Sequence, residues 1–264
     1  MSELNEYLDT AVSAAKLAGD EIKKFWGKDF QIEKKSEIDL VTEVDKKAEK
    51  IILDFILSRY PSHSVLAEES GKTLQKSSYL WHVDPLDGTT NFAHGYPSFC
   101  TSIGLEISGT LNVGVVFEPL RGELFTALHN QGSFLNGKKI SISDTRELGD
   151  SLLCTGFAYD VRKNKTNNLR EFGNFIVSAQ GVRRDGSAAL DLCYLACGRF
   201  DGFWEYNLNS WDIAAGVLMI QEAGGTVTTM DGSPIDLNGK NLLASNGKIH
   251  SQMQEILKME KSLW

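Results

Sequence analysis

Cysteine is scarce in this 264-residue chain, and the four that occur, Cys100, Cys154, Cys193 and Cys197, form no C-x-x-C motif and have no pair of histidines nearby. A zinc site of the usual spacing is therefore not expected. Cys193 and Cys197 lie four residues apart in a predicted helix, where two small buried side chains are a simpler interpretation than two metal ligands. We expect all four cysteines to be free thiols.

The sequence also lacks a hydrophobic run of bilayer-spanning length and a basic leader. Glu3, Glu6 and Asp9 lie within the first 26 residues, where a secretory signal peptide would carry positive charge. We therefore expect a cytoplasmic protein with no membrane partner.

Basic residues are in the minority, because 27 Lys and Arg stand against 35 Asp and Glu, for a formal net charge of -8. This balance argues against a general nucleic-acid or anionic-membrane surface. Hydrophobic residues make up 42% and charged residues 23% of the chain, which are ordinary values for a soluble globular protein. Disordered and fibrous classes are therefore excluded.

The chain contains no proline-rich or serine-rich linker, no block of like charges and no internal repeat. At this length it can bury an ample core without a partner. We expect one domain over residues 1–264, in which about 1–150 and 151–264 could form pseudo-domains.

Periodicity predicts the order of helices and strands. Helices are predicted over residues 4–26, 45–60, 167–177, 212–222 and 247–259, with Leu169, Phe172, Phe175 and Ile176 on one face of the third. Strands are predicted over residues 64–67, 81–84, 98–105, 111–117, 123–128, 152–155, 200–205 and 226–228, with a hairpin turn at Asn136 and Gly137. We predict a mobile hairpin or loop over residues 28–40 and a loop over residues 71–78.

The most informative stretch is residues 81–92, WHVDPLDGTTNF. It predicts a buried strand that ends at Asp84, a proline-stiffened turn that carries Asp87, and a helix capped by Asp87, Thr89 or Thr90. The free N–H groups of that helix would face the space beside the two carboxylates. A divalent metal together with a phosphate would suit that space. A corner in which both acids only cap the helix stays open from these residues alone.

Two further acidic segments accompany this stretch. Residues 64–67 predict a strand that delivers Glu68 and Glu69, and only one of these can face a given cation because successive strand side chains point to opposite sides. Asp212 opens a predicted helix in residues 211–216, WDIAAG.

Together these segments resemble a known family. Residues 84–92 resemble the first signature of the inositol monophosphatase family, residues 211–216 resemble its second, and Glu68 stands where the family keeps a metal-binding glutamate. The order and spacing agree, and the resemblance runs from the first helix to near the C-terminus. It implies an α+β fold, layered as an α-β-α-β-α sandwich.

The resemblance also implies a magnesium site with two or three ions. Its ligands would be Glu68, Asp84, Asp87, Asp212 and the carbonyl group of Leu86. It further implies inhibition by lithium and a homodimer.

The remaining site residues are likewise implied by the resemblance. Asp45 and Thr89 would hold and deprotonate the attacking water, with Glu68 as the third catalytic residue, and the N–H groups of Gly88 and Thr89 would hold the phosphate. The substrate would be held by Gly186, Ser187, Ala188, Glu205 and Asp212. From the residues alone, a capping role stays open for Asp45 and for the Gly186–Ala188 step.

The substrate is a small phosphorylated polyol or sugar in this interpretation, and three functions compete. The first is an inositol-1-monophosphatase that releases myo-inositol and phosphate. The second is a fructose-1,6-bisphosphatase or a 3′-phosphoadenosine phosphatase, and the third is a non-catalytic regulatory binding protein on the same fold. The full set of carboxylates argues against pure binding, because clustered buried acids are costly to keep without a metal.

Overall fold

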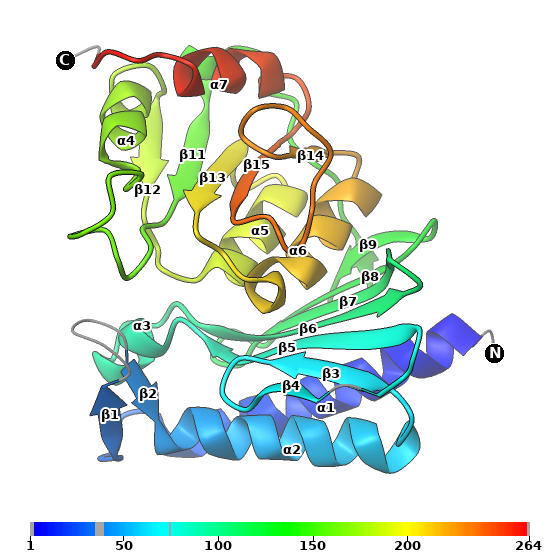
Figure 1. Cartoon of the computed structure of the whole chain (residues 1–264). Helices are drawn as coiled ribbons and strands as arrows, with labels where there is room; N and C mark the ends of the chain where they lie inside the picture. The colour runs from blue at the N-terminus through cyan, green and yellow to red at the C-terminus, as the bar shows by residue number, and fades with distance from the viewer. Residues whose placement is uncertain (1–2, 35–39, 74, 263–264) are drawn as a thin grey trace.

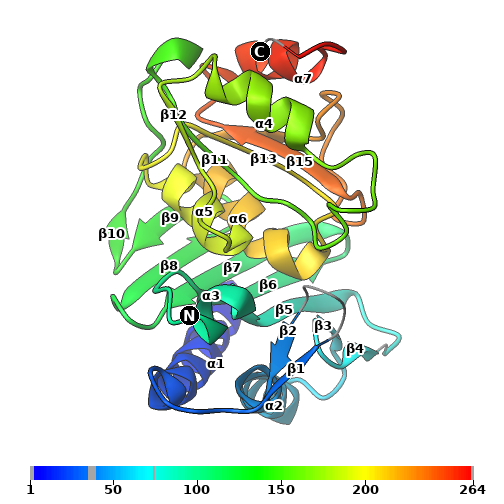
Figure 2. The ribbon, with the colours of Figure 1, turned by 90° about the vertical axis from the view of Figure 1, so that its left-hand side faces the viewer.

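The computed structural model describes residues 3–34, 40–73 and 75–262, and it alternates layers of helix and sheet (Figure 1). Helices α1 (Glu3–Phe25) and α2 (Glu43–Arg59) cover the outer face of one sheet, and α4 (Leu169–Ile176) and α7 (His250–Leu257) cover the outer face of another. Helices α5 (Ala188–Ala196) and α6 (Ser210–Glu222) lie between the two sheets, as Figure 2 shows from the side. The predicted α-β-α-β-α sandwich is therefore confirmed.

The larger sheet has eight strands in the order β10-β9-β8-β7-β6-β5-β3-β4. Its strands are β3 (Ser64–Ala67), β4 (Gly71–Thr73), β5 (Tyr79–Asp87), β6 (Cys100–Ile107), β7 (Thr110–Glu118), β8 (Glu123–Leu128), β9 (Gly132–Leu135) and β10 (Lys138–Lys139). Strands β5 to β10 form the predicted antiparallel meander, whereas β3 pairs with β5 in parallel. The parallel pairing brings the ends of β3 and β5, and the acids there, to one edge of the sheet.

The second sheet has five strands in the order β12-β11-β13-β15-β14. Its strands are β11 (Leu152–Thr155), β12 (Gly181–Arg183), β13 (Gly202–Tyr206), β14 (Thr226–Thr228) and β15 (Asn241–Ser245). A hairpin of β1 (Ile32–Lys34) and β2 (Leu40–Thr42), a short helix α3 (Thr89–Ala93) and a 3-10 turn η1 (Leu148–Asp150) complete the elements. The predicted hairpin or loop at 28–40 is thus a hairpin in part, and residues 35–39 lie outside the described part of the chain.

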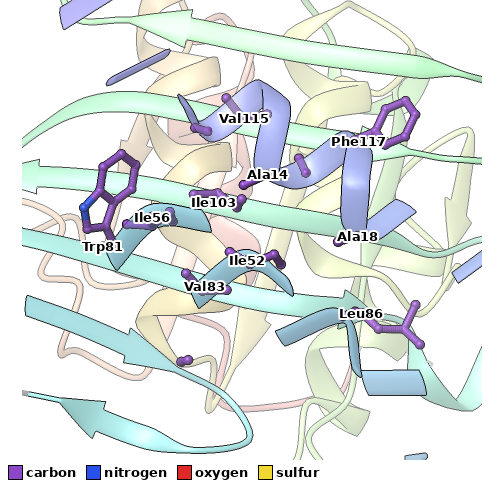
Figure 3. Close-up of a cluster of buried hydrophobic side chains, with 14 of the residues drawn as sticks. Ala14, Ala18, Ile52, Ile56, Trp81, Val83, Leu86, Ile103, Val115 and Phe117 are labelled. Atoms are coloured by element: carbon purple, nitrogen blue, oxygen red, sulfur yellow. The ribbon is translucent and has the colours of Figure 1, made fainter. Parts of the chain in front are cut away.

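Small residues on α1 allow it to approach the larger sheet closely. Ala14 and Ala18 lie one turn apart on the buried face of α1, beside Ile52 and Ile56 of α2 (Figure 3). This cluster also contains Trp81, Val83, Ile103 and Val115 from strands β5 to β7. The cluster secures the strand that leads to the central acidic motif.

On the other face of this sheet, a pair of glycines allows helix α6 to approach closely. Gly104 of β6 and Gly114 of β7 face each other in the strand register. A Cβ atom at Gly104 would lie 2.8 Å from the Cβ of Ala214, and one at Gly114 would lie 2.9 Å from the carbonyl oxygen of Ala215. Helix α6 therefore rests directly on the sheet backbone, which sets the position of its N-terminus.

Several expectations about local structure are wrong. Residues 71–73 form strand β4 instead of a loop, because they find a partner in β3. Strand β5 continues past Asp84 to Asp87 through a register shift. Helix α3 is capped by Gly88, not by a side chain of Asp87, Thr89 or Thr90.

Three helices also differ from the prediction. Thr42 caps α2, and Asp45 is the third residue of the helix, where its carboxylate closes a capping box. Helix α4 begins at Leu169 and ends at Ile176, within the predicted range of 167–177, and Leu169 and Ile176 on its apolar face are 54% and 46% exposed. Helix α7 begins at His250 and not at Gly247.

The predicted single domain stays a prediction. The cluster of hydrophobic side chains between the sheets draws Val116 and Phe125 from the first pseudo-domain and Leu192 and Phe203 from the second. None of the helices in the described ranges has both the length and the apolar character needed to cross a bilayer.

Candidate active site

A pocket of about 160 Å³ gathers eleven of the twelve residues that the sequence singles out. These are Glu68, Asp84, Leu86, Asp87, Gly88, Thr89, Gly186, Ser187, Ala188, Glu205 and Asp212. The twelfth, Asp45, is hydrogen-bonded to Thr89 from behind the pocket wall. Residues that are up to 144 positions apart, from Glu68 to Asp212, thus form one site.

A bulge in β5 positions the central pair of acids. Asp84 pairs with Ser102 of β6 and Asp87 pairs with Cys100, so three steps along β5 match two along β6. The extra residue bends the strand and re-aims the side chains beside it. The N–H of Leu86 donates to Asp84 Oδ1 at 3.0 Å, and this bond holds the turned backbone.

Three of the four predicted carboxylate ligands, Asp84, Asp87 and Asp212, have raised pKa values, and the nearby acids contribute to each shift. Burial raises the pKa of Asp84 well above its usual range, and Glu68, Asp87 and Asp212 raise it further. Burial and the charge of Asp87 do the same for Asp212. Such a group of oxygen donors fits a hard cation such as Mg²⁺, which would remove the mutual repulsion.

Asp87 has additional support from α5. Burial raises its pKa to about 6, although hydrogen bonds from Ser187 Oγ at 2.7 Å and from the N–H of Ala189 at 2.8 Å oppose that shift. The carboxylate of Asp87 therefore accepts from the first turn of α5 and ties the helix layer between the sheets to the end of β5.

Asp45 and Thr89 form a buried pair. Thr89 Oγ1 donates to Asp45 Oδ1 at 2.8 Å, and the carbonyl oxygen of Leu86 lies 3.0 Å from the same hydroxyl. The N–H of Thr42 donates to Asp45 Oδ2 at 2.8 Å. Burial raises the pKa of Asp45, while its hydrogen bonds with Thr42 and Thr89 lower it. The geometry orients the Thr89 hydroxyl toward a fixed carboxylate.

Gly88 is required by its conformation and its surroundings. Its φ is +95°, and a Cβ there would lie 2.8 Å from the carbonyl oxygen of Ser98. Only glycine adopts this conformation without strain and fits the space. The turn presents the backbone at the start of α3 to the pocket, beside Thr89.

The opposite wall of the pocket carries Glu205 and the Gly186–Ala188 step. Burial raises the pKa of Glu205 to about 8, with smaller contributions from Asp212 and Asp87 and an opposing one from Arg184. A Cβ on Gly156 would lie 2.3 Å from both carboxylate oxygens of Glu205, so Gly156 leaves the space that this side chain occupies.

Sequence reasoning assigned no role to three residues that shape the site: Thr42, Gly156 and Asp191. Asp191 lies in the pocket wall four residues after Ser187, and that helical spacing is the signal that could have found it. Glu69 was expected to point away from the cation, and it does not line the pocket; its N–H donates to Glu49 Oε2 at 2.8 Å. Among the described residues, one compact group of ligand atoms within 4.8 Å of one another is Cys154, Asp185 and Asp191.

Comparisons with known proteins agree with this geometry. A model of the inositol monophosphatase family matches residues 3–261. An inositol-1-monophosphatase from Synechocystis is 51% identical over 258 residues, which are 97% of this chain and 90% of the relative. A Nus factor SuhB from Pasteurella multocida is 40% identical over 257 residues, which are 96% of this chain and 95% of the relative.

A solved structure gives the same result at the level of the fold. The inositol monophosphatase from Anabaena superposes with a TM-score of 0.91 at 45% identity, and the match covers 99% of both chains. The chain therefore belongs to the inositol monophosphatase family, a family of metal-dependent phosphatases.

Proposed function

We propose that this enzyme hydrolyses inositol monophosphate to myo-inositol and phosphate in a Mg²⁺-dependent reaction. The observation that carries the proposal is the set of four acids, Glu68, Asp84, Asp87 and Asp212, that line one pocket together with Thr89. Acids that raise one another's pKa values by proximity mark a site built for cations. The Synechocystis relative, named an inositol-1-monophosphatase, supports the choice of substrate.

Two or three Mg²⁺ ions, when bound by these acids and the Leu86 carbonyl, would lower the pKa of the attacking water and neutralise the leaving alkoxide. Thr89 Oγ1 would accept a hydrogen bond from that water, since its own proton is directed at Asp45 Oδ1. The N–H groups of Gly88 and Thr89 would hold the phosphate, with Glu68 beside the water. No covalent intermediate is needed.

The other wall would bind the polyol. The Gly186–Ala188 step, Glu205 and Asp212 face the same pocket and would accept or donate hydrogen bonds to ring hydroxyl groups. The same groups would also suit a sugar bisphosphate or a phosphoadenosine compound, which are the alternative substrates.

A second candidate is a regulatory binding protein. It is favoured by the relative from Pasteurella multocida, which is called a Nus factor and shares 40% of its residues with this chain. We place this second because the acids and the Asp45–Thr89 pair together form a hydrolytic site. We also propose a homodimer that acts in the cytoplasm, for which light scattering of the purified protein is the first test.

Turnover assays on a panel of substrates test the proposal. Purified protein would be assayed with inositol 1-phosphate, fructose 1,6-bisphosphate and 3′-phosphoadenosine 5′-phosphate, with Mg²⁺ and again with excess chelator. We expect the highest kcat/KM with inositol 1-phosphate and no turnover in chelator. Undiminished turnover after exhaustive chelation would refute the metal assignment, and no turnover on any substrate would favour the binding protein. Inhibition by Li⁺ is measured in the same assay.

A further inference from the structure

Asp191 is a buried acid in the pocket wall for which the proposed mechanism has no use. It lies on α5, is 2% exposed and lines the same pocket as Asp87 and Glu205. Its N–H donates to the carbonyl oxygen of Ser187 at 3.0 Å, so the two residues are one helical turn apart. Helical side chains lean toward the N-terminus, which directs Asp191 to the end of α5 where Ser187 contacts Asp87.

One oxygen of this carboxyl group has no partner. Among the residues that the structure describes, Oδ1 of Asp191 is buried and makes no hydrogen bond. The carboxyl group is hydrogen-bonded to the thiol of Cys154. Its neighbours in sequence, Leu190 and Leu192, are buried and apolar. An unsatisfied buried polar atom lowers stability and calls for an explanation, such as a ligand that binds there.

A bound cation is a poor explanation for this group. Cys154, Asp185 and Asp191 offer ligand atoms within 4.8 Å of one another. However, burial raises the pKa of Cys154 well above its usual range, and Asp191 raises it further. A buried thiol with a raised pKa binds a metal less readily, because it must first lose its proton. Burial likewise raises the pKa of Asp191 and so favours its neutral form. A neutral carboxyl group can both donate and accept a hydrogen bond.

We propose that Asp191 binds a hydroxyl group of the substrate and thereby selects phosphorylated polyols over phosphate monoesters without hydroxyl groups. The inference rests on the proposed function, because it names a further contact in the same pocket. A hydroxyl group also donates and accepts, so it can satisfy Oδ1 and the acid proton together. Asp191 and Glu205 line the same pocket, and the two acids would bind different hydroxyls of one ring.

The experiment compares two substrates in two variants. Inositol 1-phosphate carries ring hydroxyls, whereas p-nitrophenyl phosphate carries none. In Asp191→Leu, the ratio of kcat/KM for inositol 1-phosphate to that for p-nitrophenyl phosphate should fall by about 10-fold, mainly through KM, as expected for one lost hydrogen bond. Asp191→Asn keeps a donor and an acceptor and should restore the ratio to within about 3-fold of the wild type.

Thermal unfolding separates binding from a structural role. If Oδ1 serves the substrate, Asp191→Leu should keep or raise Tm, because it removes a buried carboxyl oxygen that has no partner among the described residues. A structural acid behaves differently. Asp201 is 7% exposed, and its oxygens accept hydrogen bonds from Ser143 Oγ and the N–H of Leu152. The matched control Asp201→Leu should therefore lower Tm and leave the substrate ratio unchanged.

The outcomes distinguish the two proposals. A fall in Tm in Asp191→Leu with an unchanged ratio would overturn the role of Asp191 and leave the proposed function intact. If the wild type hydrolyses another hydroxylated phosphate instead of inositol 1-phosphate, the proposed substrate is wrong, and the ratio measured with that compound decides the role of Asp191. If the wild type hydrolyses p-nitrophenyl phosphate alone, both proposals fail.

Discussion

The hydrogen bond between Thr89 and Asp45 illustrates how single residues make this site. The two side chains are 44 positions apart in sequence and 2.8 Å apart in space. Asp45 has a second oxygen that accepts from the backbone of Thr42, so its carboxylate cannot turn away from Thr89. Asp45 Oδ1 and the carbonyl oxygen of Leu86 are both fixed acceptors for the Thr89 proton, so the hydroxyl presents its lone pairs in a restricted range of directions.

This pair should act as a unit in catalysis. Thr89→Ala and Asp45→Asn should each lower kcat by ~10²–10⁴-fold, because either change breaks the same proton path from the water. The double variant should be no slower than the slower single variant. Steady-state kinetics at saturating Mg²⁺ measures all three. Losses that multiply would show that Asp45 has a separate role, and a shifted Mg²⁺ midpoint in Asp45→Asn would identify that role as a metal contact.

At the scale of elements, two kinds of contact with the larger sheet hold α6 so that Asp212 reaches the pocket. Gly104 and Gly114 let the helix rest on the larger sheet. At its start, Ser210 Oγ lies 2.9 Å from Nδ1 of His82 in β5, the strand that also carries Asp84. The packing of α6 on the larger sheet thus sets the distance between Asp84 and Asp212.

Filling the glycine contact should disturb this packing. A Cβ in Gly114→Ala would lie 2.9 Å from the carbonyl oxygen of Ala215, so α6 must shift. We expect a loss of stability of ~1–3 kcal/mol, as for other overpacked cores, and a higher Mg²⁺ concentration for half-maximal activity. Differential scanning calorimetry and Mg²⁺ titration measure the two effects.

Gly149→Ala is the matched control for this change. Its Cβ would come no closer than 4.0 Å to a neighbouring atom, the carbonyl oxygen of Ser178. This variant should therefore have the same thermal stability as the wild type and need the same Mg²⁺ concentration for half-maximal activity. A Gly114→Ala variant that behaved like this control would contradict the proposed packing.

At the scale of the whole molecule, the acidic pocket lowers the stability of the folded protein when no cation is bound. Buried acids from both sheet layers meet there, and hydrophobic clusters on both sides hold the layers in place. A ligand that binds only the folded state stabilises it, so Mg²⁺ should raise Tm. The acids without a cation instead make the stability of the protein depend on pH.

The metal-free protein should lose stability as pH rises from about 4.5 to about 8. Burial raises the pKa of Glu205 to about 8 from the ordinary 4.5, so the folded state binds more protons than the unfolded state between these values. The free energy of unfolding then falls as pH rises, by at most ~1.4 kcal/mol per pH unit for this group. Glu205→Gln cannot ionise and should flatten the dependence. Urea unfolding in chelator from pH 5 to pH 8 measures both slopes, and equal slopes would contradict the assignment.

The sequence by itself determined the elements whose pattern is local. Strand β3 has the predicted bounds, and the meander from β6 to β9 follows the predicted order, since alternation and turn residues are properties of short stretches. Strands β4 and β15 were not predicted, because a strand of weak pattern forms only when a neighbouring strand offers its hydrogen bonds. The exposure of Leu169 and Ile176 depends in the same way on what covers α4.

The residues of the site also fall into those that the sequence identified and those that only the structure revealed. Motifs identified the acids Glu68, Asp84, Asp87 and Asp212, and the structure brings them together in one pocket. Only the tertiary structure revealed that Oδ1 of Asp191 has no hydrogen-bond partner within the described part of the chain. The spacing of a motif is carried by the order of residues along the chain. Whether a buried polar atom finds a partner depends on the atoms that distant segments bring beside it, and folding alone decides that.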